Sequence, residues 1–136
     1  MKKLLIIVIT GLLFASCEKD EPDYREKFVG KYECVVDYYS FNAPSGYSRA
    51  ETYLDTIEVG MIEDSSLTFH SEKKEHLFKG NGYNLVDNDG NFEFLIGDET
   101  KLRGQFFNDS IICRLGYSHH GIFGYVYHFK GKKLKK

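Results

Sequence analysis

Hydrophobic and polar residues alternate with a period of two from Phe28 onward. In the stretch Phe28–Tyr38, polar Lys31, Glu33 and Asp37 stand between the apolar positions Tyr32, Cys34, Val36 and Tyr38. This alternation places one set of side chains on a dry face and the other in water, as in a half-buried β-strand. The pattern therefore predicts a first strand over Phe28–Tyr38.

Further strands follow at short spacings, separated by turn residues such as Gly80-Asn81-Gly82, Asp87–Asn91 and Asn108-Asp109. The longest loop candidate is Ser40–Ala50, which contains proline and glycine. No stretch after Cys17 has the period of an amphipathic helix, so crossover helices are not expected. The remaining predicted strands are Tyr53–Val59, Leu67–His70, Tyr83–Val86, Phe92–Ile96, Lys101–Phe107, Ser110–Leu115 and Phe123–Phe129, with the short run His76–Phe78 as a possible ninth.

Eight or nine short strands in one domain must hide their edges to avoid aggregation. Closing the sheet into a barrel removes the edges and lines the interior with alternate side chains. We therefore predict an all-β fold, a single antiparallel up-and-down meander of 8–9 strands closed as a small barrel. The alternative is a two-sheet β-sandwich.

The N-terminus carries a separate signal. Two lysines precede an apolar run, Leu4–Phe14, which is followed by two small residues and Cys17. This pattern is typical of a secretory signal peptide and too short for a mature membrane-spanning helix. Phe14-Ala15-Ser16-Cys17 resembles the lipobox of bacterial lipoproteins, with Phe14 where leucine is usual. The resemblance implies that residues 1–16 are a signal peptide and that Cys17 is lipidated.

Polar residues dominate 17–27, which we interpret as a flexible lipidated tether before a β-barrel domain over 28–136. Lys19-Asp20-Glu21 resembles the acidic export signal of some Gram-negative lipoproteins. This resemblance implies an outer membrane-anchored lipoprotein at the cell surface; the alternative is the periplasmic face. The domain ends in a basic C-terminal tail, Lys130–Lys136, which we expect to be solvated.

Charge narrows the choice of partners. Without residues 1–16 the chain has 16 basic and 20 acidic residues, a formal charge of −4. A nucleic-acid-binding domain needs a basic excess, so no nucleic acid is expected. We expect a monomer that contacts the membrane through its N-terminal lipid and binds an unknown small ligand or protein.

The opening strand resembles that of a known family. Phe28-Val29-Gly30-Lys31-Tyr32 is similar to the Gly-x-Trp strand of lipocalins, with Tyr32 in place of tryptophan. The resemblance implies a lipocalin-like barrel. An eight-stranded barrel is wide enough to be filled by side chains or to hold one small ligand. Four tyrosines on the dry face favour a partly polar ligand pocket: Tyr32, Tyr38, Tyr125 and Tyr127. The alternative is a filled core in which the tyrosine hydroxyls lie at the mouth of the barrel.

Cys34 and Cys113 form a possible disulfide, since an even number of remaining cysteines in an exported protein favours one. In a closed meander, however, the last strand lies between them. Two strand spacings amount to roughly 9–10 Å, whereas a disulfide needs Cα atoms within about 7 Å. The alternative is two buried free thiols.

No residues with catalytic spacing are found, so we expect neither an enzyme nor a cofactor. The chain has no nucleophile elbow and no phosphate-binding glycine loop. Asp87–Asn91 does not have the spacing of a calcium loop, because its glycine is fourth. His119 and His120 would point apart on extended backbone, and His70 and His76 flank a charged corner. Solvated histidines are the simpler interpretation of both pairs, so no metal site is predicted.

Two functions therefore remain. The first is a lipid-anchored, non-enzymatic binding module of the cell envelope for a small, partly apolar ligand. The alternative is an interaction or inhibitor protein that binds an envelope or host protein through loops such as Ser40–Ala50. Tyr32-Glu33-Cys34 resembles the start of small lipoprotein inhibitors of lysozyme, which are also eight-stranded barrels. Their central Ser-Gly motif is not matched, because Ser45-Gly46-Tyr47 lies too early in the chain.

Overall fold

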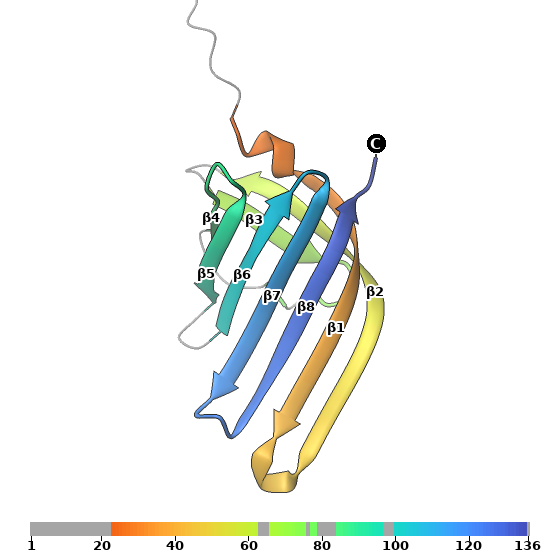
Figure 1. Cartoon of the computed structure of the whole chain (residues 1–136), viewed down its shortest axis with the longest axis vertical. Helices are drawn as coiled ribbons and strands as arrows, with labels where there is room; N and C mark the ends of the chain where they lie inside the picture. The colour runs from red at the N-terminus through yellow and green to blue at the C-terminus, as the bar shows by residue number, and fades with distance from the viewer. Residues whose placement is uncertain (1–22, 63–65, 76, 79–83, 97–99, 136) are drawn as a thin grey trace, which may run out of the picture.

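Eight antiparallel strands form one curled sheet in the computed structural model, which describes residues 23–62, 66–75, 77–78, 84–96 and 100–135 (Figure 1). The predicted all-β meander is confirmed. Because the strands belong to one sheet, the sandwich alternative is wrong. The strands are β1 (Gly30–Asn42), β2 (Tyr47–Ile62), β3 (Ser66–Ser71), β4 (Asn84–Leu85), β5 (Asn91–Ile96), β6 (Thr100–Phe107), β7 (Ser110–His119) and β8 (Phe123–Lys133).

The first strand lies in the middle of the sheet, whose order is β4-β3-β2-β1-β8-β7-β6-β5. β1 pairs with β8 from Tyr32↔Lys133 to Asn42↔Phe123. The expected pairing of the last strand with the first is therefore confirmed. Among the described residues, the two ends of the sheet meet through one bridge, Val86↔Phe92. The sheet thus curls into a barrel with its weakest joint between β4 and β5.

The segment expected as the longest loop, Ser40–Ala50, is instead the end of a hairpin. β1 and β2 pair without a gap from Gly30↔Val59 to Asn42↔Tyr47. Pro44 lies in a 3-10 turn, Ala43–Ser45, and Gly46 follows with φ 63°, a left-handed conformation that suits glycine. Proline and glycine therefore close a tight turn here, and the residues on both sides remain in strands.

Both ends of the domain also differ from the expected boundaries. β8 continues to Lys133, so four of the seven residues of the predicted tail are strand. Residues 23–27, assigned to the flexible tether, pack against the barrel: Tyr24 donates a hydrogen bond to the Val86 carbonyl at 2.6 Å. The predicted signal peptide, Cys17, Lys19-Asp20-Glu21 and the turn over 80–82 lie outside the described residues. No helix in the described part of the chain has the length and apolar character required to cross a bilayer.

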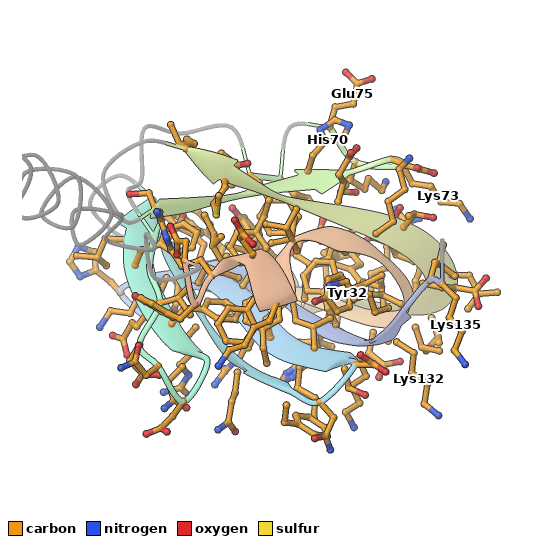
Figure 2. All side chains as sticks on the ribbon, turned by 90° about the horizontal axis from the view of Figure 1, so that it is seen from above. Tyr32, His70, Lys73, Glu75, Lys132 and Lys135 are labelled. Carbon is orange, nitrogen blue, oxygen red and sulfur yellow. The ribbon has the colours of Figure 1, made fainter. Side chains whose placement is uncertain are left out.

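Aromatic side chains fill the end of the barrel beside the N-terminal segment. From Lys31 to Asp37, the inward positions of β1 are buried and the outward ones exposed, as the alternation predicts. Ring centroids of Phe28 and Phe106 lie 4.7 Å apart, and those of Phe92 and Phe106 lie 5.2 Å apart. Figure 2, seen down the barrel, shows Tyr32 inside the curl and Lys132 outside it. We call these residues the aromatic cluster: Phe28, Tyr32, Phe69, Phe92 and Phe106.

Candidate functional site

The opposite end of the barrel is built from its four longest strands. β7, β8, β1 and β2 extend toward the two hairpin turns at the bottom of Figure 1. β3 pairs with β2 only between Ile57 and Ile62, so the start of β2 extends past it. The inner surface of this extension carries five tyrosines, which we call the tyrosine face: Tyr38, Tyr53, Tyr117, Tyr125 and Tyr127.

Strand register brings these tyrosines together. Tyr38 lies directly opposite Tyr127, and Tyr117 directly opposite Tyr125. The ring centroids of Tyr38 and Tyr127 are 4.6 Å apart, and those of Tyr117 and Tyr125 are 5.6 Å apart. Such cross-strand aromatic pairs stabilise a sheet and present broad flat surfaces.

Exposure rises along β8 from the core toward the turn. Phe129 is fully buried, Tyr127 is 8% exposed, and Phe123 beyond them is 41% exposed. The tyrosine face is therefore a sloping surface between the packed interior and water. A ligand on it would contact aromatic carbon and phenol hydroxyls together.

Two hydroxyls on this face lie in a dry environment. Burial raises the pKa of Tyr127 to about 12, and nearby tyrosines add to the effect. Burial also raises the pKa of Tyr53 to about 12, with a further contribution from the carboxylate of Asp55. Within the described residues, the buried Tyr53 hydroxyl has no hydrogen-bond partner. An unpaired buried hydroxyl is costly, and the Tyr53 hydroxyl keeps a donor and an acceptor that no described group uses.

A buried carboxylate fixes the segment beside Tyr53. Asp55 is 3% exposed and accepts hydrogen bonds from the Ser71 hydroxyl at 2.6 Å and the Lys73 amide at 3.1 Å. These bonds hold the residues after β3 against β2, and the Lys73 ammonium lies 6.0 Å from the centre of the Tyr53 ring. A hollow of about 650 Å³ lies there, lined by Glu51, Thr52, Tyr53, Lys73 and Lys74.

The structure brings together three of the four tyrosines expected to bind a ligand, namely Tyr38, Tyr125 and Tyr127. Tyr32 lies instead in the aromatic cluster, where its hydroxyl donates a hydrogen bond to the Phe28 carbonyl at 2.8 Å. Tyr53 and Tyr117 were not predicted as site residues. Both continue the inward alternation of their strands, which is the signal that identifies them.

Cys34 and Cys113 are buried free thiols in the structure. β8 lies between their strands: Cys34 is opposite Gly131, whereas Cys113 is opposite Phe129. Burial raises the pKa of Cys34 to about 12, with a smaller effect from Asp55, and burial raises that of Cys113 as well. Thiols held in the protonated form are poor nucleophiles, so neither is suited to covalent catalysis.

The two adjacent histidines do not point apart as expected for extended backbone. His120 has φ 47°, and this left-handed turn brings its ring within 4.4 Å of the His119 ring, centroid to centroid. In the described part of the chain, no three His, Cys, Asp or Glu side chains lie close enough together to hold a metal ion.

The inner surface at this end of the barrel presents two kinds of contact to a ligand. The tyrosine face offers aromatic surface and phenol hydroxyls, and the adjacent hollow adds lysines and a glutamate. Comparison of the chain with protein-family models, with curated proteins and with solved structures finds no match.

Proposed function

We propose that this protein is a lipid-anchored, non-enzymatic binding module of the cell envelope whose tyrosine face holds a small, partly apolar ligand. The observation that carries the proposal is the gathering of five tyrosines at the end of the barrel where exposure rises toward water. Because the aromatic cluster fills the other end, the ligand is assigned to the open inner surface and not to an enclosed cavity.

A neutral apolar fluorophore, N-phenylnaphthylamine, tests this proposal. Its emission should rise to saturation as purified protein is added. The affinity of Tyr125→Ala for the fluorophore should be at least about tenfold weaker, because aromatic contact area is lost. The matched control is Tyr39→Ala, since Tyr39 lies on the outer face of β1 and is 47% exposed. Absence of saturable binding, or equal weakening in both variants, would refute the tyrosine face as the binding surface.

The anchor is tested separately. Metabolic labelling with an alkyne fatty acid should tag the wild-type protein and leave Cys17→Ser unlabelled. Protease added to intact cells should remove the labelled protein if it is displayed at the surface and spare it if it faces the periplasm. Label retained by Cys17→Ser would contradict lipidation at this cysteine.

A second candidate function, binding of an envelope or host protein, rests on the edge of β2. No described residue pairs with the β2 backbone between Tyr47 and Asp55 on the side away from β1. The Thr56 carbonyl accepts a hydrogen bond from the Glu72 amide on that side, so alternate residues such as Ala50 also direct their backbone groups outward. A free edge of this kind can accept an extended segment of a partner as an additional strand.

Ala50→Pro tests this second function, because it removes one outward amide and leaves the bonds to β1 intact. A specific partner captured from envelope or host extracts by the wild-type protein should be lost with Ala50→Pro and kept with Ala50→Val. Equal capture by all three proteins would exclude strand addition at this edge.

A further inference from the structure

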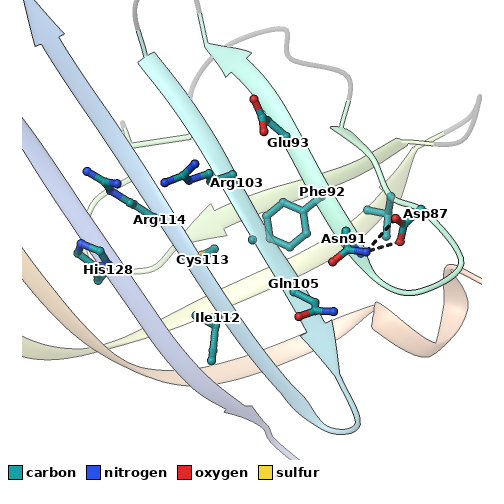
Figure 3. Close-up of a pocket in the computed structure, with 12 residues that line it drawn as sticks. Asp87, Asn91, Phe92, Glu93, Arg103, Gln105, Ile112, Cys113, Arg114 and His128 are labelled. Atoms are coloured by element: carbon teal, nitrogen blue, oxygen red, sulfur yellow. Dashed lines mark hydrogen bonds between the residues drawn. The ribbon is translucent and has the colours of Figure 1, made fainter.

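Two arginines lie directly opposite each other on the outer surface of the barrel. Arg103 on β6 pairs in register with Arg114 on β7, and both are exposed. Figure 3 shows their side chains extending in the same direction from adjacent strands, with His128 on the next strand. Like charges directly opposite on neighbouring strands repel and destabilise the sheet unless something of opposite charge lies between them.

Among the described residues, carboxylates do not provide that charge. Glu93 lies opposite Arg103 on β5, yet across the described residues no carboxylate is within ion-pair distance of either arginine. Asp87, near the same surface, is bonded to the amide and side chain of Asn91 at 2.8 and 2.9 Å. The Arg103 and Arg114 guanidinium groups therefore keep their donors available.

A hollow lies beside the two arginines. Its volume is about 320 Å³, and Lys101 supplies a third cation to its wall. Gly116 adds no side chain to its lining, and a Cβ there would fit, in ordinary contact with Val126 Cγ2 at 3.7 Å and the Tyr125 carbonyl at 3.8 Å. Among the described residues that line the hollow, three cations and the carboxylate of Glu93 give a net charge of +2.

We propose that this hollow binds a dianionic oxyanion, with Arg103 and Arg114 donating paired hydrogen bonds and Lys101 adding a point charge. The net charge of the wall matches a dianion, and guanidinium forks fit phosphate oxygens two at a time. The ligand class is therefore a small molecule that carries a phosphate monoester, which is mostly dianionic near neutral pH. The guanidinium groups lie on the opposite side of the sheet from the tyrosine face, and Tyr117 is the one described residue that belongs to that face and also lines this hollow.

Inorganic phosphate is the probe, titrated into the purified protein at low ionic strength and followed by calorimetry. Saturable binding is expected for the wild type and should weaken at least about tenfold in Arg103→Gln and Arg114→Gln. Lys130→Gln is the matched control, because Lys130 is exposed on the outer face of β8 but does not line the hollow. Phosphate should also raise the melting temperature of the wild type and not that of Arg114→Gln.

Gly116→Val distinguishes binding in the hollow from non-specific electrostatic attraction, since it fills the hollow without changing any charge. The affinity of Gly116→Val for phosphate should fall as much as the affinity of the arginine variants does. Sulfate in place of phosphate should compete, whereas acetate, a monoanion, should not. Equal binding by wild type and Arg103→Gln, equal loss in Lys130→Gln, or unchanged binding in Gly116→Val would each overturn the proposal.

Discussion

Phe106 lies at the centre of the aromatic cluster and is 2% exposed. Its ring centroid lies within 6.2 Å of those of Phe28, Tyr32, Phe69 and Phe92. The next residue, Phe107, points outward from the same strand and is 45% exposed. Adjacent residues of one type therefore have opposite roles, because successive side chains of a strand face opposite sides.

Replacement of Phe106 by alanine should lower the free energy of unfolding by about 3–5 kcal/mol, since it removes buried contacts and leaves a cavity. Phe107→Ala should change it by less than about 0.5 kcal/mol. Urea denaturation followed by circular dichroism measures both. Similar losses in the two variants would contradict the inward orientation of Phe106.

The buried thiols give a second test at single residues. Iodoacetamide at pH 8 should label Cys34 and Cys113 slowly in the native protein, because both are buried and their pKa values are raised. In urea without reductant, both should label fully, as peptide mass mapping would show. Labelling that requires prior reduction would instead establish a disulfide.

Among the elements, β1 holds the sheet together because it is paired along its whole length with β2 and, from Tyr32 onward, with β8. β5 is held differently: it pairs with β6 on one side and meets β4 only near the Val86↔Phe92 bridge in the described residues. Pairing on both sides ties a strand to global unfolding, whereas a strand at a weak joint can open locally.

Hydrogen exchange should therefore be slowest in β1 and β8 and faster in β5. Mass spectrometry of peptic peptides after timed exchange at pH 7 would measure the difference, with β2 residues 57–59 as an internal reference paired on both sides. Protection of β5 equal to that of β1 would show that the β4–β5 joint is stronger than a single bridge.

Most elements could be predicted from alternation, because burial follows a period of two in this chain. The hairpin end over Ser40–Ala50 could not, since Pro44 and Gly46 also mark loops and only pairing with a distant strand distinguishes the two. The Arg103–Arg114 pair was predictable in principle: the two residues are equally far from the Asn108-Asp109 turn. Alternation places Tyr53 on the inward side of β2, but its position near Tyr127 follows from the strand order, which no local pattern encodes.

The molecule as a whole combines a packed end and a partly wet end on a single sheet. Three of its tyrosines have their pKa raised to about 12, mainly by burial: Tyr32, Tyr53 and Tyr127. Two of them belong to the tyrosine face and one to the aromatic cluster. Ionisation of these groups therefore reports on both ends of the barrel.

Stability should fall as pH rises between about 10 and 12. Tyrosine in the unfolded chain loses its proton near pH 10, whereas the folded protein holds these protons to about pH 12. Below pH 10 the three hydroxyls contribute their full stabilisation. Above pH 10 the free energy of unfolding falls by up to about 1.4 kcal/mol per pH unit for each of them. Urea midpoints from pH 9 to 11.5 measure the slope, which Tyr127→Phe should reduce. A constant midpoint would contradict burial of these hydroxyls.

The pairing of β1 with β8 has a consequence for biogenesis. During synthesis or export that begins at the N-terminus, β1 emerges first, but its second edge is covered only after β8 has emerged. Contacts so distant in sequence slow folding and expose the nascent sheet for longer. The eleven residues of β8 thus control when the protein becomes native, and their removal would leave β1, already fully translated, paired with β2 alone.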